Sequence, residues 1–255
     1  RELAATTTAA LLVPDLRGRG RSAGLPGPYG IPAHVADLLA VLDFFHVDSA
    51  VVAGHSMGAY VAARMAAEHP ERVSSLVLVD GGLPLTTLPE EDPEELLGAI
   101  LGSSLARLGV TFAKQDDYLM MWRLHPAFGG PWDDDIEAYL TYDLVGAGDD
   151  KRPDAVRSVT SRTAVRTDGR EMLVDEATRT ALLDAHAPVR LLLAPRGVLD
   201  GDPLLPQEAV DEYIAGHPQA RVEQVSDTNH YSVLLGPGPG AATVTSAIVS
   251  ALDEA

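Results

Sequence analysis

Residues 51–60 read V-V-A-G-H-S-M-G-A-Y, and the rest of the chain can be organised around this stretch. An apolar run, 50–53, leads into it, and a helical pattern of small residues, 59–68, follows. The pattern predicts a strand that turns sharply into a helix, with the Ser56 hydroxyl exposed at the apex. Glycine is expected two positions to either side because the turn strains the backbone and leaves no room for a β-carbon.

The predicted helix after Ser56 would favour chemistry at this serine. Its N-terminus directs free N–H groups and a partial positive charge at the space above the hydroxyl. That arrangement suits a nucleophile whose reaction builds an oxyanion. A short G-x-S-x-G also recurs by chance, so an idle serine in a glycine-rich turn is the simpler alternative. The strand before it, the helix after it, and an acid and a histidine later in the chain favour the nucleophile.

Composition and net charge limit the kinds of molecule that we expect this protein to bind. The chain has 255 residues, 46% of them apolar, and its formal net charge is −18. So acidic a surface repels phosphate backbones and anionic membranes, so we expect a small-molecule substrate and neither nucleic acid nor a membrane as partner. The loop arginines Arg17, Arg19 and Arg21 could form an anion site, but pairing with acidic neighbours is favoured. The absence of cysteine excludes disulfides, thiolate metal sites and a cysteine nucleophile.

Targeting and metal-binding signals are also missing from the sequence. No apolar run approaches the length of a membrane span, and residues 1–14 lack the apolar segment of a signal peptide. We therefore expect a cytoplasmic location. The aspartate runs at 116–117, 133–135 and 149–150 do not fit a calcium-loop spacing, and no metal or cofactor is expected.

Strand-like and helix-like segments alternate at both ends of the chain, which predicts an α/β fold with a mostly parallel sheet and flanking helices. Residues 83–187 lack strand-like alternation and contain both tryptophans. We predict a core of residues 1–82 and 188–255, interrupted by a helical cap of residues 83–187. The predicted strands are 10–13, 50–53, 73–79, 189–194 and 220–225, and the predicted helices are 1–9, 32–45, 59–68, 94–109, 134–145, 170–185, 207–215 and 241–252.

A serine nucleophile needs a base to take its proton. His230 follows the last predicted strand, at the carboxyl edge of the sheet, where a loop can place an imidazole over the nucleophile. His55 adjoins Ser56, but neighbouring side chains on a sharp turn point apart, so it is expected to pack beside the turn. His125, in the predicted cap, could face substrate. His230 is the preferred base.

The base in turn needs an orienting carboxylate on a loop after an earlier strand. Three aspartates qualify, and all keep the chain order serine, aspartate, histidine. Asp200 and Asp202 lie in the loop after strand 189–194, and Asp80 ends strand 73–79. We prefer Asp200, then Asp202 with little to separate them, then Asp80.

Five segments together resemble the α/β-hydrolase superfamily, in particular its cap-containing branch of esterases and C–C-bond hydrolases. They are V-P-D-L-R-G-R-G-R-S (13–22), V-V-A-G-H-S-M-G (51–58), L-V-L-V-D-G-G (76–82), L-L-L-A-P-R-G-V-L-D (191–200) and S-D-T-N-H-Y (226–231). The resemblance implies that Ser56 is the nucleophile, His230 the base, a carboxylate near Asp200 the acid, and the Met57 backbone N–H one oxyanion donor.

The chain departs from this family at its start. In the family, further strands and a His-Gly loop precede the helix that leads into the D-x-R-G-x-G-x-S segment, and that loop supplies the second oxyanion donor. Here the sequence begins at about that helix. We therefore expect a longer natural polypeptide; a compromised chain, or a partner that fills the gap, is the alternative.

The resemblance implies a serine hydrolase that cleaves an ester or similar acyl bond of a small or medium apolar substrate through an acyl-enzyme. A serine in place of an aspartate at the turn argues against dehalogenase or epoxide hydrolase chemistry. C–C bond hydrolysis or perhydrolysis on the same residues is the alternative reaction. A catalytically impaired binding protein on the same fold is the alternative of another class.

Overall fold

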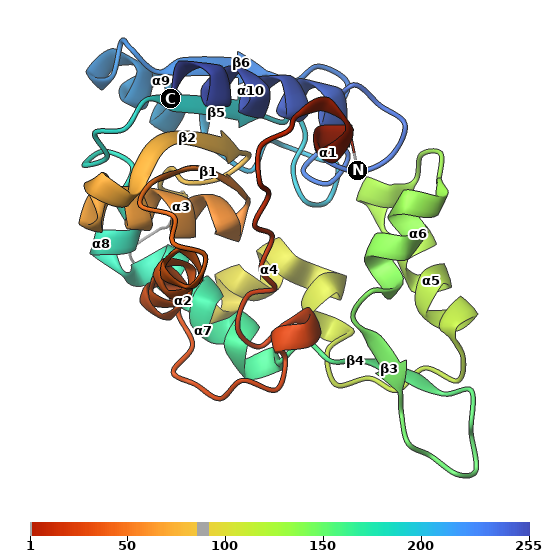
Figure 1. Cartoon of the computed structure of the whole chain (residues 1–255). Helices are drawn as coiled ribbons and strands as arrows, with labels where there is room; N and C mark the ends of the chain where they lie inside the picture. The colour runs from red at the N-terminus through yellow and green to blue at the C-terminus, as the bar shows by residue number, and fades with distance from the viewer. Residues whose placement is uncertain (1, 86–91) are drawn as a thin grey trace.

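A computed structural model describes residues 2–85 and 92–255 of the chain. Its centre is a four-stranded sheet in the order β1-β2-β5-β6, with every neighbouring pair parallel (Figure 1). The strands are β1 (Ala50–His55), β2 (Val73–Val79), β5 (Val189–Leu193) and β6 (Arg221–Gln224). The expected α/β class with a parallel sheet is confirmed.

Helices cover both faces of the sheet. The face with the larger apolar core packs against α2 (Ile31–Phe44), α3 (Met57–Glu68) and α9 (Gln207–Gly216). The opposite face is covered by α10 (Gly240–Glu254), which also packs against the short α1 (Glu2–Thr6). Three 3-10 turns lie at Gly20–Ser22, Pro70–Arg72 and Pro126–Phe128.

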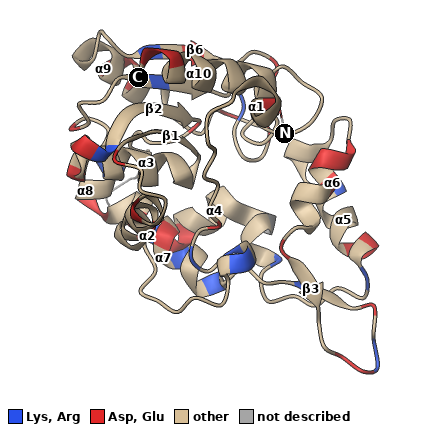
Figure 2. Ribbon diagram, viewed as in Figure 1, with Lys and Arg blue, Asp and Glu red and all other residues tan. Residues whose placement is uncertain are grey.

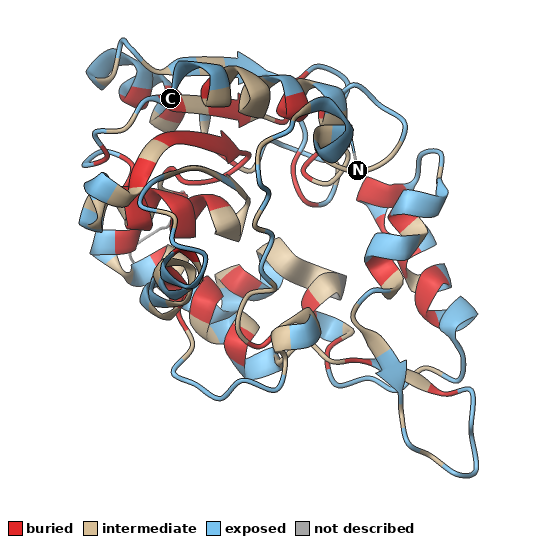
Figure 3. Cartoon of the chain, viewed as in Figure 1, coloured by how far each residue is buried: buried red, intermediate tan, exposed pale blue. Residues whose placement is uncertain are grey.

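Strand β2 is the most deeply buried element of the sheet (Figure 3). Its sequence V-S-S-L-V-L-V carries no charged residue, and Leu76, Val77 and Leu78 are fully buried. A near-continuous apolar run is what a strand needs when both faces are covered by helices. The ribbons of β1 and β2 accordingly carry neither charge colour in Figure 2. The end of β2 is thereby held in a fixed place beside the end of β1.

The chain between β2 and β5 is mainly helical, and it packs in two parts. Helices α4 (Pro93–Ala106), α7 (Arg162–Val174) and α8 (Glu176–Arg179) lie beneath the sheet in Figure 1, and Leu97 and Leu173 belong to its core. Helices α5 (Gln115–Arg123) and α6 (Asp134–Thr141) form a separate aromatic core around Trp122 and Phe128. The division into core and cap domains stays a prediction.

Three expectations about local structure are wrong. Residues 10–13 are not a strand, because an apolar run needs a ladder partner and no described strand pairs with it. The segment between β2 and β5 does contain strands, the short antiparallel pair β3 (Leu144–Gly146) and β4 (Val156–Ser158). The helix expected over 170–185 begins earlier, where the Ser161 hydroxyl caps the Ala164 N–H at 3.2 Å.

No helix in the described parts of the chain is both long and apolar enough to cross a membrane.

Candidate active site

Ser56 stands between the end of β1 and the start of α3, as the motif predicts. Its backbone has φ 54° and ψ −121°, an uncommon conformation for a residue with a side chain. A β-carbon on Gly54 would overlap the Gly58 carbonyl, so strand and helix approach closely there. A β-carbon on Gly58 would meet open space, so the expectation that both glycines are needed for room holds only for Gly54.

Two side chains from distant parts of the sequence line up with Ser56. The His230 Nε2 atom lies 3.0 Å from the Ser56 hydroxyl oxygen, and its Nδ1 lies 2.6 Å from the Asp80 carboxylate. Both His230 and Asp80 are buried, with exposed fractions of 4% and 1%. The other Asp80 oxygen accepts a hydrogen bond from the Ala194 N–H at 3.1 Å. A hydroxyl, an imidazole and a carboxylate in this order can activate the hydroxyl as a nucleophile.

The preference for Asp200 as the carboxylate next to the base is wrong. Asp200 instead contacts the Arg196 guanidinium at 3.1 Å and accepts a hydrogen bond from the Asn229 side-chain amide at 2.8 Å. Asp202 is exposed. The reason is strand order, because β2 is the direct neighbour of β1 and its last residue leads straight into Asp80. Chain order alone fitted all three aspartates.

The loop that carries His230 is fastened by residues that sequence reasoning did not single out. The Asn229 side-chain oxygen accepts from the backbone N–H groups of Tyr231 and Ser232 at 3.0 and 2.9 Å. Its amide nitrogen donates to the Ala127 carbonyl at 2.9 Å as well as to Asp200. Asparagine is typical of such turns, and this was the one available signal for its role.

The His55 side chain lies beside the turn and contacts His230. Its Nε2 lies 2.8 Å from the His230 carbonyl oxygen, and the two rings are 4.6 Å apart. Burial, with a further contribution from the neighbouring His230, lowers the pKa of His55 to about 3. The ring is therefore neutral at physiological pH and has a single N–H to donate.

A cavity of about 480 Å³ opens above Ser56. That volume is in the range of small-molecule sites. Its walls are mostly apolar and come from both the sheet side and the segment between β2 and β5. They include the aromatic residues Tyr118, Trp122, Tyr139, Tyr142 and Tyr231, and the aliphatic residues Leu85, Leu97, Ile100, Leu101, Met172, Val198 and Leu204. His125 is absent from these walls and packs against Trp122 and Phe128.

Met57 is the first residue of α3 and also lines the cavity. The N–H groups in the first turn of a helix have no partner within it, so the Met57 N–H is available next to the Ser56 hydroxyl. The helix dipole adds a partial positive charge at the same point. This placement suits an oxyanion donor. In the described residues, no group of three or more histidines, aspartates and glutamates is arranged to hold a metal ion.

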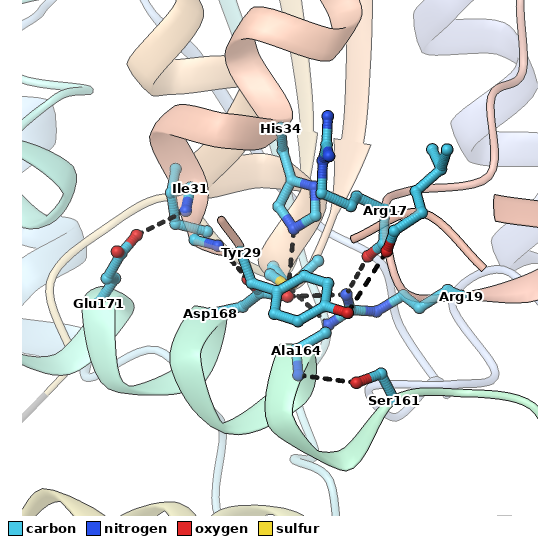
Figure 4. Close-up of polar contacts among 12 residues, drawn as sticks. Arg17, Arg19, Tyr29, Ile31, His34, Ser161, Ala164, Asp168 and Glu171 are labelled. Atoms are coloured by element: carbon cyan, nitrogen blue, oxygen red, sulfur yellow. Dashed lines mark hydrogen bonds and ion pairs between the residues drawn. The ribbon is translucent and has the colours of Figure 1, made fainter. Parts of the chain in front are cut away.

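A second polar cluster surrounds the buried Asp168 (Figure 4), and its Arg19 also lines the cavity. Asp168 of α7 is fully buried and lies 2.7 Å from the Arg19 guanidinium and 3.1 Å from His34 Nε2. It also accepts a hydrogen bond from the Gly30 N–H at 2.8 Å. Burial raises the pKa of Asp168, but its contacts with His34 and Arg19 outweigh burial and hold the pKa below its usual value. Arg17 pairs with Asp37 at 2.6 Å, so the predicted pairing of these loop arginines is confirmed for two of them.

Comparisons with known proteins bear on the fold of this chain. Residues 2–116 match the family model described as alpha/beta hydrolase fold. The chain is 28% identical over 230 residues to a pimeloyl-[acyl-carrier protein] methyl ester esterase of Aromatoleum aromaticum, covering 86% of this chain and 83% of the esterase. It is 40% identical over 93 residues to lipase LipV of Mycobacterium tuberculosis, a match that spans only 34% of the lipase.

A crystal structure of E-2-(acetamidomethylene)succinate hydrolase superimposes with a TM-score of 0.71 at 20% identity, over 94% of this chain and 80% of that one. At this identity the likeness shows the fold alone. The chain has the α/β-hydrolase fold, in agreement with the resemblance found in its motifs. Its relatives by sequence include this esterase and this lipase.

Proposed function

We propose that this protein is a serine hydrolase that cleaves an ester or similar acyl bond through an acyl-enzyme. The observation that supports this most strongly is the continuous contact from Asp80 through His230 to Ser56, at 2.6 and 3.0 Å, beneath a largely apolar cavity. In this proposal Asp80 replaces Asp200 as the acid.

The reaction follows from the contacts. His230 Nε2 takes the Ser56 proton as the hydroxyl oxygen attacks the acyl carbon, while Asp80 keeps the imidazole in the tautomer that has its proton on Nδ1. The Met57 N–H donates to the developing oxyanion. His230 then returns the proton to the leaving alcohol. Water then attacks the acyl carbon while His230 takes a proton from it. His230 returns this proton to the Ser56 oxygen as the acyl group leaves as a carboxylic acid.

The cavity supports a small or medium acyl group of apolar character. Aliphatic side chains of α4 and α7 form much of its wall, and Tyr231 and Trp122 form an aromatic side near the base. A site of this composition gains affinity from the apolar area that it removes from water. The names of the esterase and lipase relatives support the same bond type.

A fluorophosphonate probe tests the nucleophile directly. We expect the wild-type protein to be labelled and to hydrolyse p-nitrophenyl esters, with activity rising from acetate to medium chain lengths. Ser56→Ala should abolish labelling and lower kcat by roughly 10⁶-fold, as loss of the nucleophile does in other serine hydrolases. Labelling of Ser56→Ala at the wild-type rate would refute the assignment. Turnover of dienoate diketones without ester turnover would favour the C–C hydrolase alternative instead.

A further inference from the structure

We propose that His55 is a positioning residue for His230, and that its ring and its Nε2–H hold the main chain of the base in place over Ser56. The kinetic part of this inference rests on the proposed hydrolase function. The structural part does not.

His55 joins the base to the strand that carries the nucleophile. It is the last residue of β1 and precedes Ser56 directly, whereas His230 lies 175 positions further along the chain. The His55 Nε2 meets the His230 carbonyl oxygen at 2.8 Å. A shift of the His230 loop away from Ser56 would have to break this bond. The contact therefore sets the distance between the two reacting groups from the main-chain side.

The rings add a second contact. The His55 and His230 ring centres are 4.6 Å apart, with their planes inclined by 38°. The His230 ring also meets Tyr231 edge-on at 5.4 Å. The imidazole of the base thus contacts two rings while its two nitrogens contact Ser56 and Asp80. Packing of this kind limits rotation of the imidazole about its bond to the main chain.

The protonation state of His55 fits a donor role. A carbonyl oxygen accepts only, so the bond requires a proton on His55 Nε2. The lowered pKa keeps this ring neutral, so it puts no second positive charge beside His230, which must itself become positively charged during the reaction. His55 cannot serve as the base, because its Nε2 is engaged with the carbonyl and the Ser56 hydroxyl contacts His230 instead.

Matched variants separate positioning from general loss of structure. In His55→Gln the side-chain amide places an N–H near the original Nε2, whereas His55→Leu fills a similar volume without a donor. His217→Leu is the control, because His217 Nε2 also contacts a main-chain carbonyl, that of Leu183 at 3.2 Å, and neither residue lines the cavity.

For a wild type that hydrolyses esters, we expect His55→Leu to lower kcat by about 10- to 100-fold with KM changed less than about twofold, because small misplacements of a catalytic group carry costs of this order. His55→Gln should recover kcat to within about threefold of wild type. His217→Leu should retain the wild-type kcat when measured below its melting temperature. A His55→Leu variant with kcat within about twofold of wild type would overturn the proposal.

Side-chain NMR gives a readout that needs no activity. With ¹⁵N-labelled histidine, the His230 ring signals, assigned by their loss in His230→Gln, should be a single narrow set in wild type, His55→Gln and His217→Leu. In His55→Leu they should broaden or split. Unchanged His230 signals in His55→Leu would overturn the proposal even if the protein hydrolysed nothing. Probe labelling of wild type against Ser56→Ala judges the hydrolase function separately.

Discussion

Two buried aspartates of this protein each lie against a histidine, and the two pairs differ in what lies beyond the ring. Asp80 contacts His230, whose second nitrogen reaches Ser56 in the wall of the cavity. Asp168 lies 3.1 Å from the Nε2 of His34, which is fully buried and has no hydrogen-bond partner for either ring nitrogen among the described residues. A buried aspartate–histidine pair thus becomes a candidate acid–base pair only when a nucleophile and open space complete it.

The surroundings explain what the second pair does instead. Asp168 joins α7 to α2 through His34 and to the arginine-rich loop through Arg19 (Figure 4). The same Arg19 side chain donates to the Met57 sulfur at 3.3 Å. Arg19 therefore connects Asp168 to the residue that follows Ser56. We interpret Asp168 as a structural anchor behind the cavity. The experiments below test the difference between the two pairs and the protonation of His55 beside His230.

The largest effect is expected from the same chemical change at the two competing acids. Asp80→Asn should lower kcat by about 10⁴-fold, because an amide neither fixes the tautomer of His230 nor stabilises its charged form. Asp200→Asn should change kcat by less than about threefold, since an amide oxygen still accepts from Asn229. Steady-state kinetics on a p-nitrophenyl ester distinguishes them. The opposite order would restore Asp200 as the acid.

A smaller effect, on stability, is expected at the second cluster. Asp168→Ala leaves His34 and Arg19 without their shared carboxylate, and loss of one member of a buried ion pair costs about 3–5 kcal/mol. Asp43→Ala is the matched control, because Asp43 pairs with Arg72 at 2.8 Å on the surface and such pairs contribute about 0–1 kcal/mol. Urea unfolding measures both. Equal destabilisation by the two variants would contradict the role of Asp168 as an anchor.

The smallest effect is expected in the free energy of unfolding, which should depend on pH because of His55. Its pKa is about 3 in the folded chain and near the usual 6.5 when unfolded, so the unfolded state binds more protons between these values. Stability should therefore fall as the pH drops from 7 to 5, by at most about 2 kcal/mol from this group. His55→Gln should show a shallower fall in urea unfolding at the two pH values. Identical pH dependence in both proteins would show that His55 is not held neutral.

Much of the parallel sheet could be predicted, because its signals are local. The run 73–79 is rich in valine and leucine and carries no charge, and it forms β2 with the predicted bounds. Residues 10–13 have a similar apolar character but are not a strand, because pairing depends on a neighbour and not on the run itself. Helix α5, with the sequence Q-D-D-Y-L-M-M-W-R, was not predicted, and its buried Tyr118, Leu119 and Trp122 belong to the separate aromatic core.

The features of the candidate site also divide into those that the sequence could predict and those that it could not. The G-x-S-x-G turn at Ser56 could be predicted because strand, turn and helix are consecutive in sequence. His230 could be predicted because it follows the last strand of a parallel sheet. The contact between His55 and His230 could not, because the direction of a side chain at the end of a strand depends on what packs against it.

The alternation of strands and helices and the positions of Ser56 and His230 beside them can be read from the sequence, since each follows from a short continuous pattern. Which carboxylate lies next to His230 depends on the folded chain. Asp80 and Asp200 satisfy the same chain order, and it is the placement of β2 directly beside β1 that brings Asp80 to within 2.6 Å of His230. Which carboxylate meets the base depends on strand order and loop path, and these are set by packing over the whole sheet.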